Sequence, residues 1–174
     1  MKKLLPIFFL FGLLFFNNCS KNEKIEIVGI EEDQIEDQMI KAYREGMVAF
    51  DDKFYIEAAK KFNEAEILFP QSQWAPRSAL MAAYAYYYDD YNNRAISELI
   101  NFFKKYPNDP NTSYAHYLLA MSYYNKIVDE KKDLEPLKNS KKQFEYIVEN
   151  YPNTEFSLDS KFKLDLINEM IASK

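Results

Sequence analysis

The sequence predicts an all-α fold, a solenoid of two-helix repeats with three helix pairs and one further helix. An aromatic residue followed by proline occurs at Phe69-Pro70, Tyr106-Pro107 and Tyr151-Pro152, at intervals of 37 and 45 residues. Such periods are typical of α-solenoids, in which each unit buries its apolar face against its neighbours. Only three of the 174 residues are glycine, which disfavours a turn-rich β fold, and 48% are hydrophobic, which disfavours disorder.

The N-terminal segment has the features of an export signal. Lys2 and Lys3 form a short positive region, and residues 4–16 form an apolar run broken only by Pro6 and Gly12. This run is too short for a membrane span, which needs about 20 residues, but it suits the apolar core of a signal peptide. We therefore leave the segment out of the predicted fold.

Cys19 is the only cysteine in the chain and follows this run, within Asn17-Asn18-Cys19-Ser20. A single cysteine forms no intramolecular disulfide, and an exported chain gains little from a stray thiol. Residues 1–19 resemble a lipoprotein signal peptide that ends at a lipidated Cys19, although Asn18 is atypical before such a cysteine. The alternatives are an ordinary cleaved signal with an incidental thiol, or an uncleaved anchor. Residues 20–32 are interpreted as a tether.

Residues 33–174 are predicted to form one repeat domain of helix pairs. Each of the three prolines ends a second helix, because proline has no N–H with which to continue the helical ladder. The repeats are predicted at about 33–70, 71–107 and 108–152, followed by the first helix of a fourth. The predicted helices span residues 33–51, 54–69, 73–88, 91–105, 111–127, 136–151 and 154–171.

Local signals place the ends of these helices. Asp33 and Glu36 have the spacing of a capping box at the start of the first helix. Asp51-Asp52-Lys53 and Asp89-Asp90 are typical of turns between the two helices of a pair. The charged stretch 129–135 lengthens the corresponding loop of the third repeat. The last helix opens a fourth repeat that the sequence does not complete.

Aligning the repeats on their prolines gives the tetratricopeptide pattern. A small residue recurs where the first helix packs closely, and small and large apolar residues recur along the second helix. In register, these positions are Gly46, Ala83 and Ala120; Ala58, Ala95 and Ser140; Phe62, Leu99 and Phe144; and Ala65, Phe102 and Ile147. Agreement at several offsets at once predicts a tetratricopeptide-repeat α-solenoid.

The later repeats also resemble one family of the bacterial envelope. The resemblance rests on Ala82–Tyr87, Tyr91, Ala95, Ile96, Phe102, Phe103, Tyr106-Pro107, Pro110-Asn111, Tyr114–Tyr124, and Phe144–Leu166 with Tyr151-Pro152-Asn153-Thr154. These residues are similar to those of the BamD family, lipoproteins of the outer-membrane β-barrel assembly machinery, and coverage runs from about Asp33 to the end. Members of that family continue into C-terminal repeats that this sequence lacks.

The resemblance implies a non-catalytic scaffold of the outer membrane, held by its lipid anchor on the periplasmic side. Ser20 after Cys19 implies sorting to that membrane. The implied partners are BamA, other barrel-assembly subunits and unfolded outer-membrane protein segments; in the family, the BamA contact relies heavily on the C-terminal repeats. An alternative is a tetratricopeptide coordinator acting with the Tol-Pal or peptidoglycan machinery. Such proteins usually carry a coiled-coil heptad segment or lack the lipid cysteine, and no heptad run occurs here.

The register also predicts a peptide-binding groove. One position along from the close-packing face, the first helices carry a stripe that faces the inner curve of the predicted solenoid. Its residues are Tyr43, Leu80 and Tyr117; Met47, Tyr84 and Met121; and Phe50, Tyr87 and Tyr124. Aromatic and methionine side chains suit an apolar or aromatic peptide. In the family, this region is thought to receive the aromatic-ended terminal segment of unfolded barrel proteins. The alternative is that adjacent helices bury the stripe as core.

Nothing in the sequence indicates an enzyme, a cofactor or a metal site. His116 is the only histidine and falls at a packing position, so we interpret it as structural. Carboxylates occur at helix starts and turns, where they serve as caps and solvated faces. The net charge of −5 disfavours nucleic-acid binding, which needs a basic surface. Trp74 is interpreted either as an interface anchor or as packing under the preceding loop.

Overall fold

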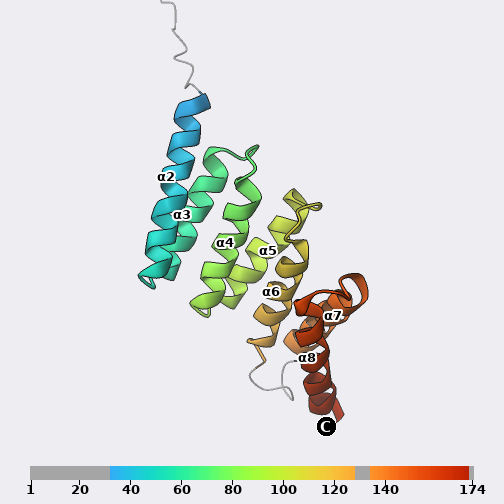
Figure 1. Ribbon diagram of the computed structural model, residues 1–174. Helices are drawn as coiled ribbons and strands as arrows, with labels where there is room; N and C mark the ends of the chain where they lie inside the picture. Colours follow the sequence, from blue (N-terminus) through green and yellow to red (C-terminus); the bar gives the residue numbers. More distant parts are fainter. Residues whose placement is uncertain (1–31, 128–133, 173–174) are drawn as a thin grey trace, which may run out of the picture. The chain divides into compact units, whose positions relative to one another are not determined.

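The computed structural model of the protein describes residues 32–127 and 134–172. Within these ranges the regular elements are seven α-helices and no strand, so the predicted all-α fold is confirmed. They are α2 (Glu32–Asp51), α3 (Tyr55–Leu68), α4 (Ala75–Tyr88), α5 (Asn92–Lys105), α6 (Thr112–Tyr124), α7 (Glu135–Asn150) and α8 (Glu155–Ala172) (Figure 1). The predicted signal peptide, Cys19, the tether up to residue 31 and most of the predicted 129–135 loop lie outside the described residues.

The helices end close to where the local signals place them. α3, α5 and α7 each stop two residues before a proline, as the missing proline N–H requires. The predicted cap at Asp33 is wrong, because α2 has already begun at Glu32 and Asp33 lies in its first turn. Helix α6 ends at Tyr124, three residues earlier than predicted, and Asn125, Lys126 and Ile127 form a turn.

The turns inside the first two repeats share one backbone geometry. Lys53 and Asp90 have positive φ angles, 66° and 56°, in the left-handed region. The N–H of Phe54 donates to the carbonyl of Ala49 over 2.8 Å, and the N–H of Tyr91 donates to that of Tyr86 over 3.0 Å. This pattern satisfies the last carbonyls of a helix and reverses the chain. It aligns α3 against α2, and α5 against α4.

The core confirms the predicted register. The twelve aligned positions are buried, and most are fully inaccessible. Gly46 lies so close to the ring of Phe62 that a Cβ on the glycine would come within 2.8 Å of two ring carbons. Ser140 replaces alanine in the third repeat, and its hydroxyl donates a hydrogen bond to the carbonyl of Ala120 over 3.1 Å. The buried hydroxyl of Ser140 therefore has a hydrogen-bond partner.

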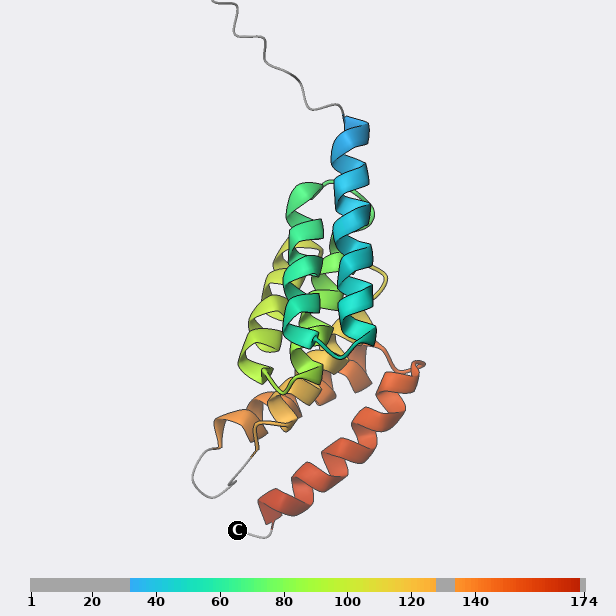
Figure 2. The ribbon, with the colours of Figure 1, turned by 90° about the vertical axis from the view of Figure 1, so that its left-hand side faces the viewer.

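Contacts between the described helices run along the chain. Each helix packs against its sequence neighbours, and α4 with α6 and α6 with α8 also touch. Figure 2 shows α2 and α3 side by side, running in opposite directions. Phe50 of α2 also stacks on Tyr84 of α4. The first helices of the repeats (α2, α4, α6 and α8) therefore lie along one side, which is where the predicted groove residues lie.

Candidate functional site

The nine predicted groove residues lie on α2, α4 and α6, and all of them pack against the core. Leu80 is buried, whereas the other eight are half-buried. Tyr43, Met47 and Phe50 cover the cluster around Phe62. Tyr84 and Tyr87 pack against the cluster that contains Leu99. Tyr117, Met121 and Tyr124 pack against the cluster that contains Phe144. The stripe thus has one side against the core and another at the surface.

Aromatic rings connect the stripe across successive first helices. Phe50 of α2 stacks on Tyr84 of α4, with centroids 5.4 Å apart and planes at 18°. Tyr84 also contacts Tyr114 of α6 at 6.2 Å, and Tyr114 contacts Phe156 of α8 at 5.5 Å. Tyr88 adds an edge-on contact with Tyr84 at 4.7 Å. We call the nine predicted residues together with Tyr88, Tyr114 and Phe156 the aromatic face.

Three members of this face were missed by sequence reasoning. Tyr88 and Tyr114 lie four and three residues from the predicted Tyr84 and Tyr117, so helical spacing could have found them. Phe156 lies four residues after Pro152, in register with Trp74 and Asn111, and so falls outside the three predicted columns. Its contact with Tyr117, at 5.3 Å between centroids, depends on how α8 packs against α6.

Burial keeps three tyrosines of the aromatic face protonated at neutral pH. Burial raises the pKa of Tyr84 to about 12, and its hydrogen bond with Tyr88 acts in the same direction. Burial also raises the pKa of Tyr114 and of Tyr117. The Tyr117 hydroxyl donates a 2.7 Å hydrogen bond to Oδ2 of Asp159, which ties α6 to α8. These three side chains therefore combine an apolar ring with a neutral hydroxyl.

Two hollows lie along the aromatic face. The one between α4 and α6 has a volume of about 330 Å³ and is lined by Arg77, Leu80, Met81, Tyr84, Asn111 and Tyr114. The other has a volume of about 270 Å³ and is lined by Met39, Ile40, Tyr43, Arg44 and Trp74. The structure thus brings Leu80 and Tyr84 to one hollow and Tyr43 to the other, while the hollow between α4 and α6 does not include Tyr87 or Tyr117.

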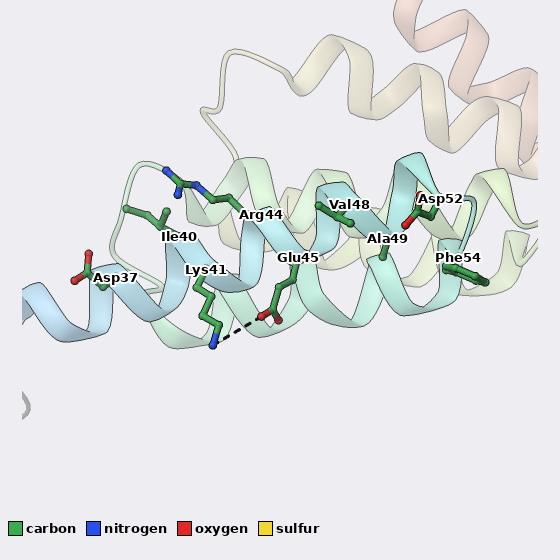
Figure 3. Close-up of a pocket in the computed structure, with 9 residues that line it drawn as sticks. All are labelled: Asp37, Ile40, Lys41, Arg44, Glu45, Val48, Ala49, Asp52 and Phe54. Atoms are coloured by element: carbon green, nitrogen blue, oxygen red, sulfur yellow. Dashed lines mark ion pairs between the residues drawn. The ribbon is translucent and has the colours of Figure 1, made fainter.

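A larger and more open hollow of about 660 Å³ lies along the outer side of α2 (Figure 3). Figure 3 shows Ile40 and Arg44 on one side of the helix and the Lys41–Glu45 pair on the other. Val48 and Phe54 are 61% and 66% exposed on this surface. Ile40 and Arg44 also line the 270 Å³ hollow, so the two hollows adjoin at these residues.

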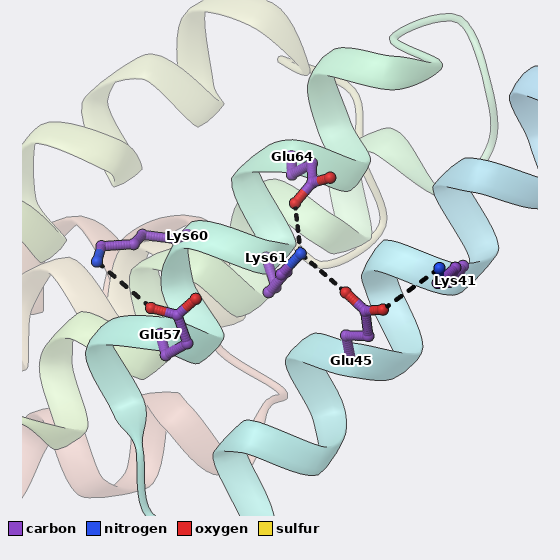
Figure 4. A network of polar contacts seen from close by, with 6 residues as sticks. All are labelled: Lys41, Glu45, Glu57, Lys60, Lys61 and Glu64. Atoms are coloured by element: carbon purple, nitrogen blue, oxygen red, sulfur yellow. Dashed lines mark hydrogen bonds and ion pairs between the residues drawn. The ribbon is translucent and has the colours of Figure 1, made fainter.

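A polar network joins α2 to α3 on the solvent side (Figure 4). Lys61 Nζ lies 2.8 Å from Glu45 Oε2 and 2.9 Å from Glu64 Oε2, and Lys41 Nζ lies 3.9 Å from Glu45 Oε1. The hydrogen bond from Lys61 lowers the pKa of Glu45, and the bond to Glu45 raises that of Lys61. These groups are open to water, so the network adds little to the attachment of the two helices.

His116 of the third repeat lies between one aromatic ring of the second repeat and one of the third. Its ring lies 4.1 Å from the ring of Phe103 and 4.4 Å from that of Tyr146. Its Nδ1 is 3.1 Å from Oε1 of Gln143, and burial lowers its pKa. Among the described residues there is no group of three or more His, Cys, Asp or Glu that could hold a metal ion. Within the same ranges, no helix is both long and apolar enough to cross a membrane.

Comparison with known proteins identifies the family. The family model of YfiO, described as an outer membrane lipoprotein, matches residues 35–174. The outer membrane protein assembly factor BamD of Caulobacter vibrioides is 35% identical over 132 residues, which is 76% of this chain and 43% of that protein. This chain belongs to the BamD family. The BamD protein of Rickettsia prowazekii is 31% identical over 174 residues, which is all of this chain and 66% of that protein.

Other comparisons define the extent of the match. BamD of Neisseria meningitidis serogroup B is 30% identical over 134 residues, covering 71% of this chain and 50% of that protein. The chain therefore spans between 43% and 66% of the length of these BamD relatives. Among solved structures, the first tetratricopeptide domain of Spaghetti (RPAP3) bound to an HSP90 peptide has a TM-score of 0.60 at 18% identity, covering 79% of this chain and 95% of that one. This likeness confirms the tetratricopeptide-like solenoid fold.

Proposed function

We propose that the protein is a non-catalytic scaffold of the outer-membrane β-barrel assembly machinery. The observation that carries this proposal is the family match over residues 35–174, which includes the whole described domain apart from the first turn of α2. In the proposal, lipid on Cys19 anchors the chain to the periplasmic side of the outer membrane. The solenoid then presents its surfaces to BamA, to other assembly subunits and to unfolded barrel proteins.

The aromatic face supports a role in holding segments of unfolded barrel proteins. All of its rings except the exposed Tyr88 are half-buried, so they are ordered by the core and still exposed on one side. Tyr84, Tyr114 and Tyr117 are neutral, and two hollows of about 270 and 330 Å³ open on this face. An ordered aromatic surface binds apolar peptide side chains at low entropic cost, because its own side chains are already fixed.

Substitution of Tyr84 tests this role. Tyr84→Ala removes the stack on Phe50 and one wall of the 330 Å³ hollow, and should weaken binding of a capped neutral peptide with two aromatic residues by about fivefold or more. Tyr91→Ala is the matched control, because Tyr91 is 55% exposed at the start of α5, outside the aromatic face. Fluorescence anisotropy of a labelled peptide gives the affinity, and far-UV circular dichroism gives the helicity. Unchanged binding contradicts the proposal, and loss of helicity assigns Tyr84 to the core.

Purification from membranes tests the assembly role. The intact lipoprotein, captured through an affinity tag from detergent-solubilised envelopes, should recover BamA. Recovery of only Tol-Pal or peptidoglycan factors would instead favour the envelope-coordinator alternative. The variant Cys19→Ser tests the anchor, since without the lipid the chain should leave the membrane fraction. Retention of this variant in the membrane would contradict lipid anchoring at Cys19.

A further inference from the structure

One arginine lines the 270 Å³ hollow where α2 meets α4, and a second lies over two of its aromatic walls. The chain has three arginines, and Arg44 on α2 and Arg77 on α4 both lie at this place. The guanidinium carbon of Arg77 is 5.4 Å from the centre of the Trp74 ring and 5.8 Å from that of Tyr43. The rings of Tyr43 and Trp74 contact each other with centroids 5.5 Å apart.

The walls of this hollow are apolar apart from the cation. Met39, Ile40, Tyr43 and Trp74 line it together with Arg44, and its volume is about 270 Å³. Pockets that hold whole small molecules have volumes of about 300–1,000 Å³. This hollow is therefore of a size to take one large side chain of a peptide rather than a complete ligand.

Neither guanidinium group has a carboxylate partner among the residues that the structure describes. The lysines nearby differ, since Lys41 and Lys61 both pair with Glu45. Arg44 and Arg77 are exposed, and stacking on a ring leaves the N–H donors at the edge of a guanidinium group free. One unpaired cation thus lines the hollow and another stacks on its walls, in a chain whose net charge is negative.

We infer that this hollow binds a peptide segment in which an acidic residue adjoins an aromatic one. The aromatic side chain fills the hollow against Trp74 and Tyr43, and the neighbouring carboxylate accepts hydrogen bonds from Arg44 and Arg77. A guanidinium group matches a carboxylate through two parallel N–H donors, which a lysine does not provide. The inference rests on the proposed peptide-binding role of the aromatic face, to which it adds the chemical class of the ligand.

The experiment uses Trp74 as the probe, because it is the only tryptophan in the chain and forms a wall of the hollow. Two peptides with blocked ends are titrated into the full chain while its emission is recorded. One carries a glutamate beside a phenylalanine, and the other carries glutamine in place of the glutamate. The glutamate peptide should bind about tenfold more tightly, and the difference should shrink as salt is added.

Variants then assign the preference to the two arginines. Arg44→Gln and Arg77→Gln should each weaken binding of the glutamate peptide, and the double variant should bind both peptides equally, with the affinity of the glutamine peptide unchanged. Arg94→Gln is the matched control, since the third arginine lines a different hollow beside Asp90 and Lys126. Because Arg77→Gln removes the stacking on Trp74, its starting emission will differ, and affinities are taken from titration midpoints.

Four results would overturn the inference. If the wild type binds both peptides equally, the arginines do not select a carboxylate, while the peptide-binding role of the face stands. If the double variant keeps the preference for glutamate, another group supplies it. If only a peptide with a free C-terminal carboxylate binds, the site recognises a chain end and not an acidic side chain. If neither peptide binds, both this inference and the peptide-binding role are contradicted. The assembly role would still be tested separately, by the purification from membranes.

Discussion

Replacing Gly46 with alanine should destabilise the protein, although alanine normally stabilises a helix. Gly46 is buried within α2, where a Cβ atom would lie 2.8 Å from both Cδ1 and Cε1 of Phe62. The Phe62 ring is completely inaccessible, and the ring of Tyr43 packs against it at 5.3 Å. The ring therefore has no open space into which to move, and the backbone of α2 or α3 has to shift.

Two opposing effects set the magnitude. Replacing glycine by alanine in a helix interior gains about 1 kcal/mol from propensity. Inserting a methyl group into a closely packed core costs about 1–3 kcal/mol. Since the contact is shorter than van der Waals distance to a fixed ring, we expect a net loss of about 1 kcal/mol, or about 4 °C in Tm for a domain of this size.

Urea titration followed by circular dichroism measures this loss, and the background Phe62→Leu provides the control. The smaller leucine leaves room for the methyl group, so in that background Gly46→Ala should become stabilising through the propensity gain. The reasoning is refuted if Gly46→Ala stabilises the wild type, or if its effect is the same in both backgrounds. The equivalent positions Ala83 and Ala120 already hold a methyl group in the other repeats.

Burial lowers the pKa of His116, so the unfolded chain binds its proton first as the pH falls; the free energy of unfolding should therefore be greatest above about pH 7 and decline below about pH 6.5. His116→Phe should flatten this decline in urea titrations, and an unchanged slope would point to other groups. Glu66→Ala removes a carboxylate that is 6% exposed and accepts a 2.8 Å hydrogen bond from the Tyr106 hydroxyl, which should cost about 1–3 kcal/mol; a neutral result would show that water replaces it. Phe144→Ala empties a fully buried site and should cost about 3–5 kcal/mol, whereas Phe162→Ala, at a side chain 59% exposed, should change the urea midpoint little; equal effects would contradict the assigned burial.

The repeat register could be predicted because one period controls both spacing and packing. Once Pro70, Pro107 and Pro152 fix the repeat ends, positions such as Phe62 and Ala120 must face the same interior. The same logic placed the groove columns on the first helices. It did not show how deep each side chain lies, since Leu80 is buried while its aligned partners are half-buried.

Contacts that join different repeats were beyond sequence reasoning. Arg77 reaches Tyr43 across 34 positions of the chain, and this depends on side-chain torsions that no period specifies. Glu66 meets Tyr106 for the same reason, although each belongs to a recognisable helix end. The predicted cap at Asp33 was wrong because a capping pattern expresses only a preference, and α2 begins at the earlier residue Glu32.

The contacts of the described helices, which run mainly between sequence neighbours, have a consequence for how this chain folds. Stability in such an array is close to a sum of intrinsic helix-pair terms and nearest-neighbour coupling terms. Opening can therefore start at either end of the array and stop at an interface, so amide exchange should be slowest near Leu99, in the middle of the array, and faster toward α2 and α8. Such low contact order also favours rapid folding. A peptide bound across several first helices would couple the corresponding repeats and make their unfolding more cooperative.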